Sequence, residues 1–284
     1  MSGSKPVLGP FTLGVCSWSL QVKNIPELTR LLGELGVNVV QIACGDPHHA
    51  NWDEGENLPG IALGSGIVMT GAMLGFPGED YTSPETIKRT GGFGDPAIRA
   101  ARLDRLAWGL KRTQELGLQD LTLHAGFLPE LHDPGRQAFL DTLAKAGQMA
   151  AVAGVTLAFE TGQETAELLR RTLDDLDSPN IMVNFDPANM LLYDMGDPVE
   201  AVGILGDRIR SVHLKDARRP TVPGQWGQEV PLGQGQVDFP RFLAALKGIG
   251  YSGPLVIERE VGDQAGRVRD VAAGLGYLRS LVSE

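Results

Sequence analysis

The chain has 284 residues, 42% of them hydrophobic, which is enough for one large domain with a substantial core. Its 35 acidic and 25 basic residues give a formal net charge of −10, which opposes binding to nucleic acid as a partner. No apolar run approaches the ~20 residues of a membrane-spanning helix, and the N-terminal segment MSGSKPVLGP does not resemble a signal peptide. We therefore expect a cytoplasmic protein without a membrane partner, and leave homo-oligomerisation open.

Short β-like runs alternate with helical segments along the whole chain. Eight runs are rich in Val, Ile and Leu and mostly continuous, as in strands buried on both faces of a parallel sheet. They cover residues 13–18, 37–43, 67–72, 121–124, 155–160, 181–185, 209–215 and 254–259. The only two cysteines, Cys16 and Cys44, fall at the first two runs. Both are predicted to be buried reduced thiols, because two are too few for a disulfide scaffold.

The segments between these runs carry helix signals. Residues 25–35 place apolar side chains at 25, 28, 31, 32 and 35, which form one face of a helix. Other helices are expected to start at an Asp, alone or before Pro, since Asp caps a helix and Pro fits its first position. These start residues are Asp95, Asp133, Asp197 and Asp238, ahead of helices that reach residues 116, 153, 205 and 249, and a last helix covers 265–281. Gly36, Gly117 and Gly250 are the expected left-handed ends of three helices.

Eight strands in strict alternation with helices imply a closed barrel or a long doubly wound sheet. We favour the barrel, because an open sheet normally carries a glycine fingerprint after its first strand, and VCSWSLQ has none. Residues 11–284 are therefore predicted to form a single α/β domain, a parallel-stranded (β/α)8 TIM barrel, after a flexible N-terminal tail of residues 1–10. The long Gly- and Pro-rich segments 75–94 and 217–237 are predicted to lie at the C-terminal face, where barrel active sites occur.

Four side chains that can bind a metal lie at the ends of four successive strands. They are Glu160, Asp186, His213 and Glu258. A single carboxylate in such a place is commonly a helix cap, but four strand ends of a barrel face one point, where three carboxylates would repel one another without a cation. The sequence therefore predicts one divalent metal ion here. Three oxygen ligands and one imidazole suit Mn²⁺ best, with Mg²⁺, Co²⁺, Fe²⁺ or Zn²⁺ as alternatives.

The segments AFETG, NFDPANMLLYDMGDP, VHLKDAR, GQWGQEVPLGQGQVDF and LVIERE resemble the xylose isomerase-like sugar isomerase/epimerase superfamily, which includes ketose 3-epimerases and inosose dehydratases and isomerases. The resemblance covers the chain from the first strand to the last helix and is most specific over residues 155–260. It implies the same four metal ligands and an isomerase or epimerase of a ketose or keto-sugar derivative, acting through a metal-stabilised enediolate. The acid/base pair that it implies is Glu160 and Glu258.

Further side chains near the strand ends are candidates for binding substrate. Lys215 lies two residues after His213, on the same side of its strand, and either holds a substrate hydroxyl or phosphate or balances the carboxylates. His124 ends the fourth strand and is either a substrate contact or a satisfied core residue. Trp18 and Trp226 are either apolar walls against a sugar ring or ordinary packing residues.

Three more positions are interpreted through the resemblance. Arg219 stands where 3-epimerase relatives carry an Arg that contacts substrate or metal-bound water, with Arg218 as an equal alternative. Relatives usually have Asp-x-x-His at the sixth strand, whereas this chain has Asn189, which can hydrogen-bond a hydroxyl but cannot shuttle a proton. Gln41 stands where relatives often place Glu. The pair His48 and His49 is interpreted as a polar loop cluster rather than as metal ligands.

Other functions are weighed against the isomerase. A metal-dependent dehydratase or lyase acting on a keto-sugar, inosose or keto-glycoside shares the first half of the mechanism and is the main alternative. A non-catalytic sugar-binding barrel is less favoured, because binding alone does not require a metal among three carboxylates. An apurinic-site endonuclease is least favoured, because the extra zinc ligands are missing and the net charge of −10 opposes DNA.

Overall fold

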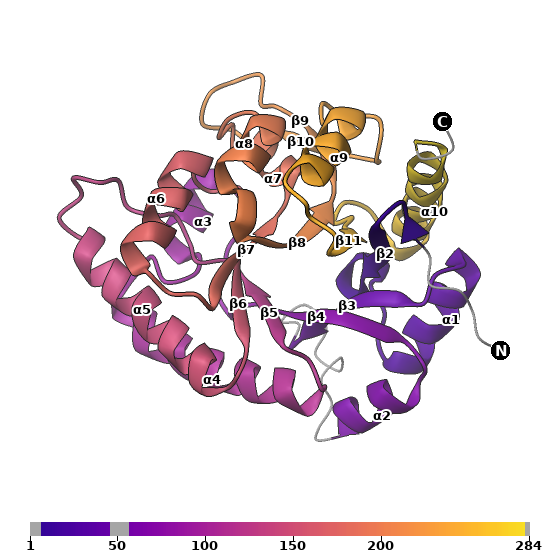
Figure 1. Cartoon of the computed structure of the whole chain (residues 1–284), viewed down its shortest axis with the longest axis horizontal. Helices are drawn as coiled ribbons and strands as arrows, with labels where there is room; N and C mark the ends of the chain where they lie inside the picture. Colours follow the sequence, from indigo (N-terminus) through magenta and orange to yellow (C-terminus); the bar gives the residue numbers. More distant parts are fainter. Residues whose placement is uncertain (1–6, 46–56, 282–284) are drawn as a thin grey trace.

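The computed structural model of the protein describes residues 7–45 and 57–281. Eight parallel strands form a barrel inside a ring of helices (Figure 1). In chain order they are β2 (Phe11–Cys16), β3 (Val39–Cys44), β4 (Val68–Leu74), β5 (Asp120–Leu123), β6 (Thr156–Glu160), β7 (Ile181–Phe185), β8 (Ile209–Leu214) and β11 (Pro254–Ile257). β11 pairs with both β8 and β2, and β2 pairs with β3, which closes the ring. The predicted TIM barrel is confirmed.

The helices surround this barrel. They are α1 (Ile25–Leu35), α2 (Leu58–Gly64), α3 (Pro84–Thr90), α4 (Arg99–Glu115), α5 (Arg136–Val152), α6 (Ala166–Leu176), α7 (Pro187–Leu192), α8 (Pro198–Leu205), α9 (Phe239–Gly248) and α10 (Gln264–Ser280), with 3-10 turns η1 (Ser17–Leu20), η3 (Pro96–Ile98) and η4 (Gly206–Arg208). α1 has the predicted bounds and ends at Gly36 with φ 69°. Asp197 and Asp238 cap α8 and α9 as predicted. Asp133 was wrongly predicted to cap α5, since it bonds the backbone N–H of Gly135 in the preceding turn.

Two small pairings lie outside the barrel and were not expected from the sequence. β1 (Val7–Leu8) pairs antiparallel with β2, and Leu8 is fully buried. These two residues therefore belong to the sheet rather than to a free tail. After β8, β9 (Asp216–Arg218) and β10 (Gln228–Val230) form a two-stranded antiparallel hairpin within the long segment 217–237 and its flank.

The strands are buried as continuous apolar runs should be in a barrel covered by helices. Every residue of β3 is buried, which matches the absence of alternation in its sequence. Cys16 and Cys44 are buried thiols without a disulfide, as predicted. Each helix within residues 7–45 and 57–281 is too short or too polar to cross a membrane.

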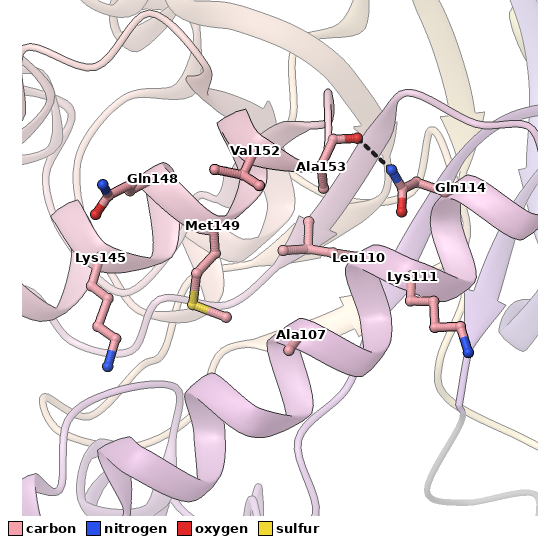
Figure 2. Close-up of a pocket in the computed structure, with 9 residues that line it drawn as sticks. All are labelled: Ala107, Leu110, Lys111, Gln114, Lys145, Gln148, Met149, Val152 and Ala153. Atoms are coloured by element: carbon pink, nitrogen blue, oxygen red, sulfur yellow. Dashed lines mark hydrogen bonds between the residues drawn. The ribbon is translucent and has the colours of Figure 1, made fainter.

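A shallow groove crosses the outer helical wall between α4 and α5 (Figure 2). Leu110 and Met149 form its apolar floor, and Gln114 bridges the two helices by donating to the carbonyl oxygen of Ala153 over 2.7 Å. Residues of α4 and α5, together with Ala153 just after α5, line the groove, so it is separate from the strand ends that hold the candidate ligands.

Asp216 organises the loop that follows β8. Its carboxylate accepts backbone N–H groups from Ala217 at 2.9 Å, Gly233 at 2.9 Å, Gly235 at 2.8 Å and Val237 at 3.1 Å. Gly235 is required because a Cβ at that position would lie 2.0 Å from Asp216 Oδ1. One buried carboxylate thus satisfies donors from both ends of the segment and fixes its return to the barrel.

Replacing Asp216 by Asn should destabilise the protein, because an amide of the same shape turns a donor toward backbone N–H groups. Each buried group left without its partner costs about 1–3 kcal/mol, so we expect a loss of at least about 2 kcal/mol in the free energy of unfolding. Urea denaturation measures it. Asp207→Asn is the control, since the Asp207 side chain is 83% exposed and should shift the midpoint little. Equal midpoints for the two variants would contradict the role of Asp216.

Candidate metal centre and active site

The C-terminal ends of four neighbouring strands bring the four predicted ligands together. Glu160 is the last residue of β6, Asp186 follows β7, His213 lies near the end of β8, and Glu258 follows β11. One ligand atom from each residue lies within 4.8 Å of the others, and all four side chains are buried. This metal-ligand group, as we call these four residues, is a direct result of the barrel, because parallel strands end at one face.

His213 is at the centre of the metal-ligand group. Its Nδ1 lies 2.9 Å from Glu160 Oε1, 3.4 Å from Glu258 Oε2 and 4.0 Å from Asp186 Oδ2. Its other ring nitrogen, Nε2, lies 2.6 Å from Gln41 Oε1. The imidazole therefore presents one nitrogen to the carboxylates and the other to a neutral amide.

The two oxygens of Asp186 have different environments. Oδ1 caps α7 by accepting the backbone N–H groups of Ala188 at 2.8 Å and Asn189 at 3.0 Å. Oδ2 is buried and has no hydrogen-bond partner among the described residues, and the same is true of Glu160 Oε2. The helix-cap and ligand interpretations of Asp186 are therefore compatible, since each uses one oxygen. Two buried carboxylate oxygens that accept no hydrogen bond fit a cation site, where the ion takes the place of the missing donors.

The charges of the group are strongly coupled. Burial raises the pKa of Asp186 well above its ordinary value, and Glu258 and Glu160 add to this effect while Lys215 opposes it. Burial also raises the pKa of Glu258, but Lys215 and His213 outweigh it and hold that pKa well below its ordinary value. Glu258 is thus an ionised carboxylate, and a cation among these side chains would relieve the cost of ionising Asp186 as well.

Lys215 and Asn189 connect the carboxylates across the group. Lys215 Nζ donates to Glu258 Oε2 at 3.0 Å, Glu260 Oε2 at 2.5 Å and Asn189 Oδ1 at 3.1 Å. Asn189 Nδ2 donates to Glu160 Oε1 at 3.3 Å. Lys215 was interpreted either as a substrate contact or as a residue that balances the carboxylates, and these contacts fit the second interpretation. Gly162, with φ 140°, permits the approach, since a Cβ there would lie 2.4 Å from Asn189 Cβ.

Trp18 and His124 both contact a carboxylate of the group. Trp18 lies in η1, not in the first strand as predicted, and its Nε1 donates to Glu258 Oε1 at 2.6 Å. Its ring also meets His213 edge-on, with centroids 5.8 Å apart. Trp18 is therefore a hydrogen-bond donor to Glu258, which the apolar-wall interpretation omitted. His124 Nε2 lies 3.3 Å from Glu160 Oε2.

Arg219 and Trp226 are directed to other neighbours. Arg219 pairs with Asp194 Oδ1 at 2.6 Å and donates to the carbonyl oxygen of Gly196 at 2.5 Å, so its contacts hold the loop between α7 and α8. Trp226 stacks edge-on against Tyr193, with ring centroids 4.8 Å apart. The sequence analysis did not identify Tyr193. His48 and His49 lie outside the described residues.

Cys16 and Gln41 also lie near His213. The sequence analysis predicted Cys16 only as a buried thiol, and it noted Gln41 through the resemblance without assigning it a role in the site. Cys16 forms a second group of ligand atoms with His213 and Glu258, again within 4.8 Å of one another. Burial raises the pKa of Cys16 to about 12, so it stays a thiol and is a poor ligand beside the oxygen-rich set. The signal in the sequence that could have placed Gln41 in the site is a polar residue within the wholly buried strand VVQIAC.

Glu164 is a buried acid close in sequence to Glu160, and its titration makes a testable prediction. Burial raises its pKa from 4.5 to about 8, against the smaller effect of a hydrogen bond from the backbone of Gly162. The folded state then binds the proton more tightly than the unfolded chain, so stability is lost as pH rises from 4.5 towards 8. Glu164→Gln should remove this loss. Urea denaturation at pH 5, 7 and 9 should show that the free energy of unfolding of the variant rises relative to that of wild type as the pH increases.

The exposed residue Glu167 supplies the control for this measurement. Glu167→Gln makes the same substitution at an exposed position, and it should not show the rise in stability relative to wild type that Glu164→Gln shows between pH 5 and pH 9. A constant difference between wild type and Glu164→Gln across that range would refute the raised pKa of Glu164.

Comparison with known proteins gives a consistent picture. The family described as xylose isomerase-like TIM barrel matches residues 24–281. L-ribulose-5-phosphate 3-epimerase UlaE of Shigella flexneri is 29% identical over 243 residues, which cover 82% of this chain and 81% of that protein. The crystal structure of a xylose isomerase domain protein from Planctomyces limnophilus has a TM-score of 0.86 at 33% identity, over 95% of this chain and 97% of that one.

A more distant likeness adds support for the fold alone. A xylose isomerase-like TIM barrel protein from Mycobacterium smegmatis, solved in complex with magnesium, has a TM-score of 0.67 at 15% identity. The match covers 95% of this chain and 97% of that one, so the barrel is shared over nearly its whole length.

Proposed function

This chain belongs to the xylose isomerase-like TIM barrel family, and we propose that it is a divalent-metal-dependent isomerase or epimerase of a ketose or keto-sugar derivative. Its curated relatives are sugar epimerases, which makes it an enzyme of sugar isomerisation or epimerisation. The metal, the acid/base residues and the range of substrates are the parts that we propose here. UlaE is named for a phosphorylated ketose, so phosphorylated and unphosphorylated ketoses both enter the test.

The observation that carries the proposal is that Glu160 Oε2 and Asp186 Oδ2 accept no hydrogen bond from the described residues inside a buried metal-ligand group. The nearest positively charged or protonatable groups are His124 Nε2, 3.3 Å from the first oxygen, and Lys215 Nζ, 3.7 Å from the second. With His213 neutral, as a metal-ligating imidazole is, three carboxylates and the ammonium of Lys215 leave two formal negative charges, which a divalent cation would neutralise. The donor set of three carboxylates and one imidazole suits Mn²⁺ or Mg²⁺.

When bound, such a cation would act as a Lewis acid that polarises the carbonyl of a ketose. The side chains of this chain would then move the proton on the neighbouring carbon. Glu258 is suited to accept it, because Lys215 and His213 keep it ionised. Glu160, which reaches His213 Nδ1 from β6 while Glu258 reaches it from the end of β11, is the residue that we propose returns a proton to the opposite face.

The surrounding residues would orient the substrate rather than carry its proton. Asn189 and His124 both contact Glu160 and offer hydrogen-bonding groups to sugar hydroxyls. Trp18 holds Glu258 Oε1 through its indole N–H, which leaves the other carboxylate oxygen beside Lys215. Because Asn189 cannot shuttle a proton, proton transfer in this proposal depends on the two glutamates.

Deuterium exchange tests the proposal directly. The Mn²⁺-loaded protein is incubated in D₂O with a panel of ketoses, ketose phosphates, inososes and 3-keto-glycosides, and NMR follows the carbon beside the carbonyl. We expect deuterium at that carbon without loss of water. Elimination products would instead assign a dehydratase or lyase. Absence of exchange with the whole panel, with unimpaired sugar binding by Glu160→Gln, would leave a non-catalytic binding protein.

A further inference from the structure

Gln41 connects the metal-ligand group to the opposite side of the barrel interior. Its side chain is 3% exposed and lies on β3. Its Oε1 faces His213 Nε2 at 2.6 Å, and its Nε2 donates to Thr122 Oγ1 at 3.0 Å. Thr122, on β5, is 1% exposed. One amide therefore joins β3, β5 and β8, no two of which are neighbours in the barrel.

The orientation of this amide determines which nitrogen of His213 carries a proton. A carbonyl oxygen only accepts hydrogen bonds, so His213 Nε2 must be the donor to Gln41. In the neutral ring the lone pair is then on Nδ1, the nitrogen that lies 2.9 Å from Glu160 and 3.4 Å from Glu258. An amide turned the other way would present N–H to Nε2 and put the ring proton on Nδ1, where it would block a cation.

The thiol of Cys16 supports the orientation that leaves Nδ1 available, whereas the hydroxyl of Thr122 pairs with either end of the amide. In the structure Thr122 Oγ1 accepts from the amide nitrogen of Gln41. On the other side, Cys16 Sγ lies 3.9 Å from Gln41 Oε1, and as a thiol it donates to that oxygen. Gln41 Oε1 therefore receives two donors, from Cys16 and His213, and the amide nitrogen has its own acceptor.

We propose that Gln41 is a positioning residue, held in place by Thr122, that keeps His213 in the tautomer whose Nδ1 can bind a divalent cation. The proposal rests on the metal site of the proposed function. The amide accepts a hydrogen bond from His213 without a charge, whereas a carboxylate at this position would add a fourth negative group to the three already present. Partners of this kind, which orient a ligating imidazole, typically change metal affinity by about 10–100-fold when removed.

The test compares two substitutions at position 41. Gln41→Met keeps length and burial but removes the acceptor, and should weaken Mn²⁺ binding in calorimetry by roughly 10–100-fold. In protein labelled with ¹⁵N-histidine and loaded with diamagnetic Zn²⁺, the downfield His213 Nε2–H resonance should move upfield or vanish. Gln41→Glu keeps an acceptor and should retain that resonance, with Mn²⁺ affinity much nearer to wild type than that of Gln41→Met.

Thr122→Val tests the relay from its far side, without touching His213. It should weaken Mn²⁺ binding in the same direction as Gln41→Met, by a smaller factor, and near-ultraviolet circular dichroism checks that the core is intact. A Gln41→Met protein that binds Mn²⁺ as tightly as wild type, or whose Nε2–H resonance does not move, would overturn the proposal.

The outcome also separates this proposal from the proposed function. If wild type does not bind Mn²⁺, the metal-dependent function fails, while the Nε2–H resonance of the metal-free protein still tests the bond between Gln41 and His213. If wild type binds Mn²⁺ and both position-41 variants match it, only the role of Gln41 is lost.

Discussion

Glu258→Gln is expected to lower kcat by roughly 10²–10⁴-fold, the range that a positioned acid or base contributes. The substitution removes the negative charge beside His213 and Lys215 but keeps an oxygen that can accept from Trp18 Nε1. Local packing should therefore survive while proton abstraction fails. Steady-state kinetics and deuterium exchange at the carbon beside the carbonyl should fall together, because both depend on the same proton.

Glu260→Gln is the matched control for this variant. Glu260 also contacts Lys215, but its side chain is 50% exposed and it is not part of the metal-ligand group. We expect a much smaller change in kcat, since solvent screens a charge at this position. If Glu258→Gln keeps a kcat similar to that of Glu260→Gln, with Mn²⁺ bound as in wild type, then Glu258 is not one of the acid/base pair.

Removal of the divalent ion should abolish turnover. After dialysis against a chelator we expect the rate to fall to background and to return on addition of Mn²⁺, because the proposed reaction needs the ion as the Lewis acid that polarises the carbonyl. The ion should also stabilise the fold. Saturation at 100 times the dissociation constant adds about 2.7 kcal/mol to the free energy of unfolding, which thermal denaturation with and without Mn²⁺ would detect.

Asp186→Asn shows whether these effects arise at the metal-ligand group. An amide oxygen can still cap α7 through the backbone N–H groups that Asp186 Oδ1 accepts, so the helix should form. The loss of one negative charge should prevent Mn²⁺ from restoring either activity or thermal stability. Full activity in a sample that elemental analysis shows to be free of metal would contradict the proposed function.

The sequence predicted the barrel well because burial and alternation are properties of local residue patterns. Continuous apolar runs marked all eight strands, and the bounds of β7 were predicted to the residue. Helices α3, α6 and α7 were missed although their start signals were present. Ser83 caps α3 before a Pro, and Thr165 caps α6. Asp186 caps α7 in the same way; the sequence analysis had weighed a helix cap against a metal ligand for such a carboxylate and favoured the ligand.

The metal-ligand group could be predicted because the ends of successive parallel strands always meet at one face. The surrounding contacts could not, since they depend on how each loop turns. Trp18 reaches Glu258 because the chain forms a 3-10 turn directly after β2. Arg219 is drawn to Asp194 beyond the end of β9. Neither turn is determined by the spacing of residues in the sequence.

The hydrogen bond between Trp18 and Glu258 links the first turn after a barrel strand to the last barrel strand. During synthesis from the N-terminus, Glu160, Asp186 and His213 leave the ribosome before Glu258. Glu258, the fourth residue of the metal-ligand group, reaches its place only when β11 inserts between β8 and β2. Completion of the barrel and completion of the site are therefore one event, so a nascent chain cannot present the full ligand set to metal before it has folded.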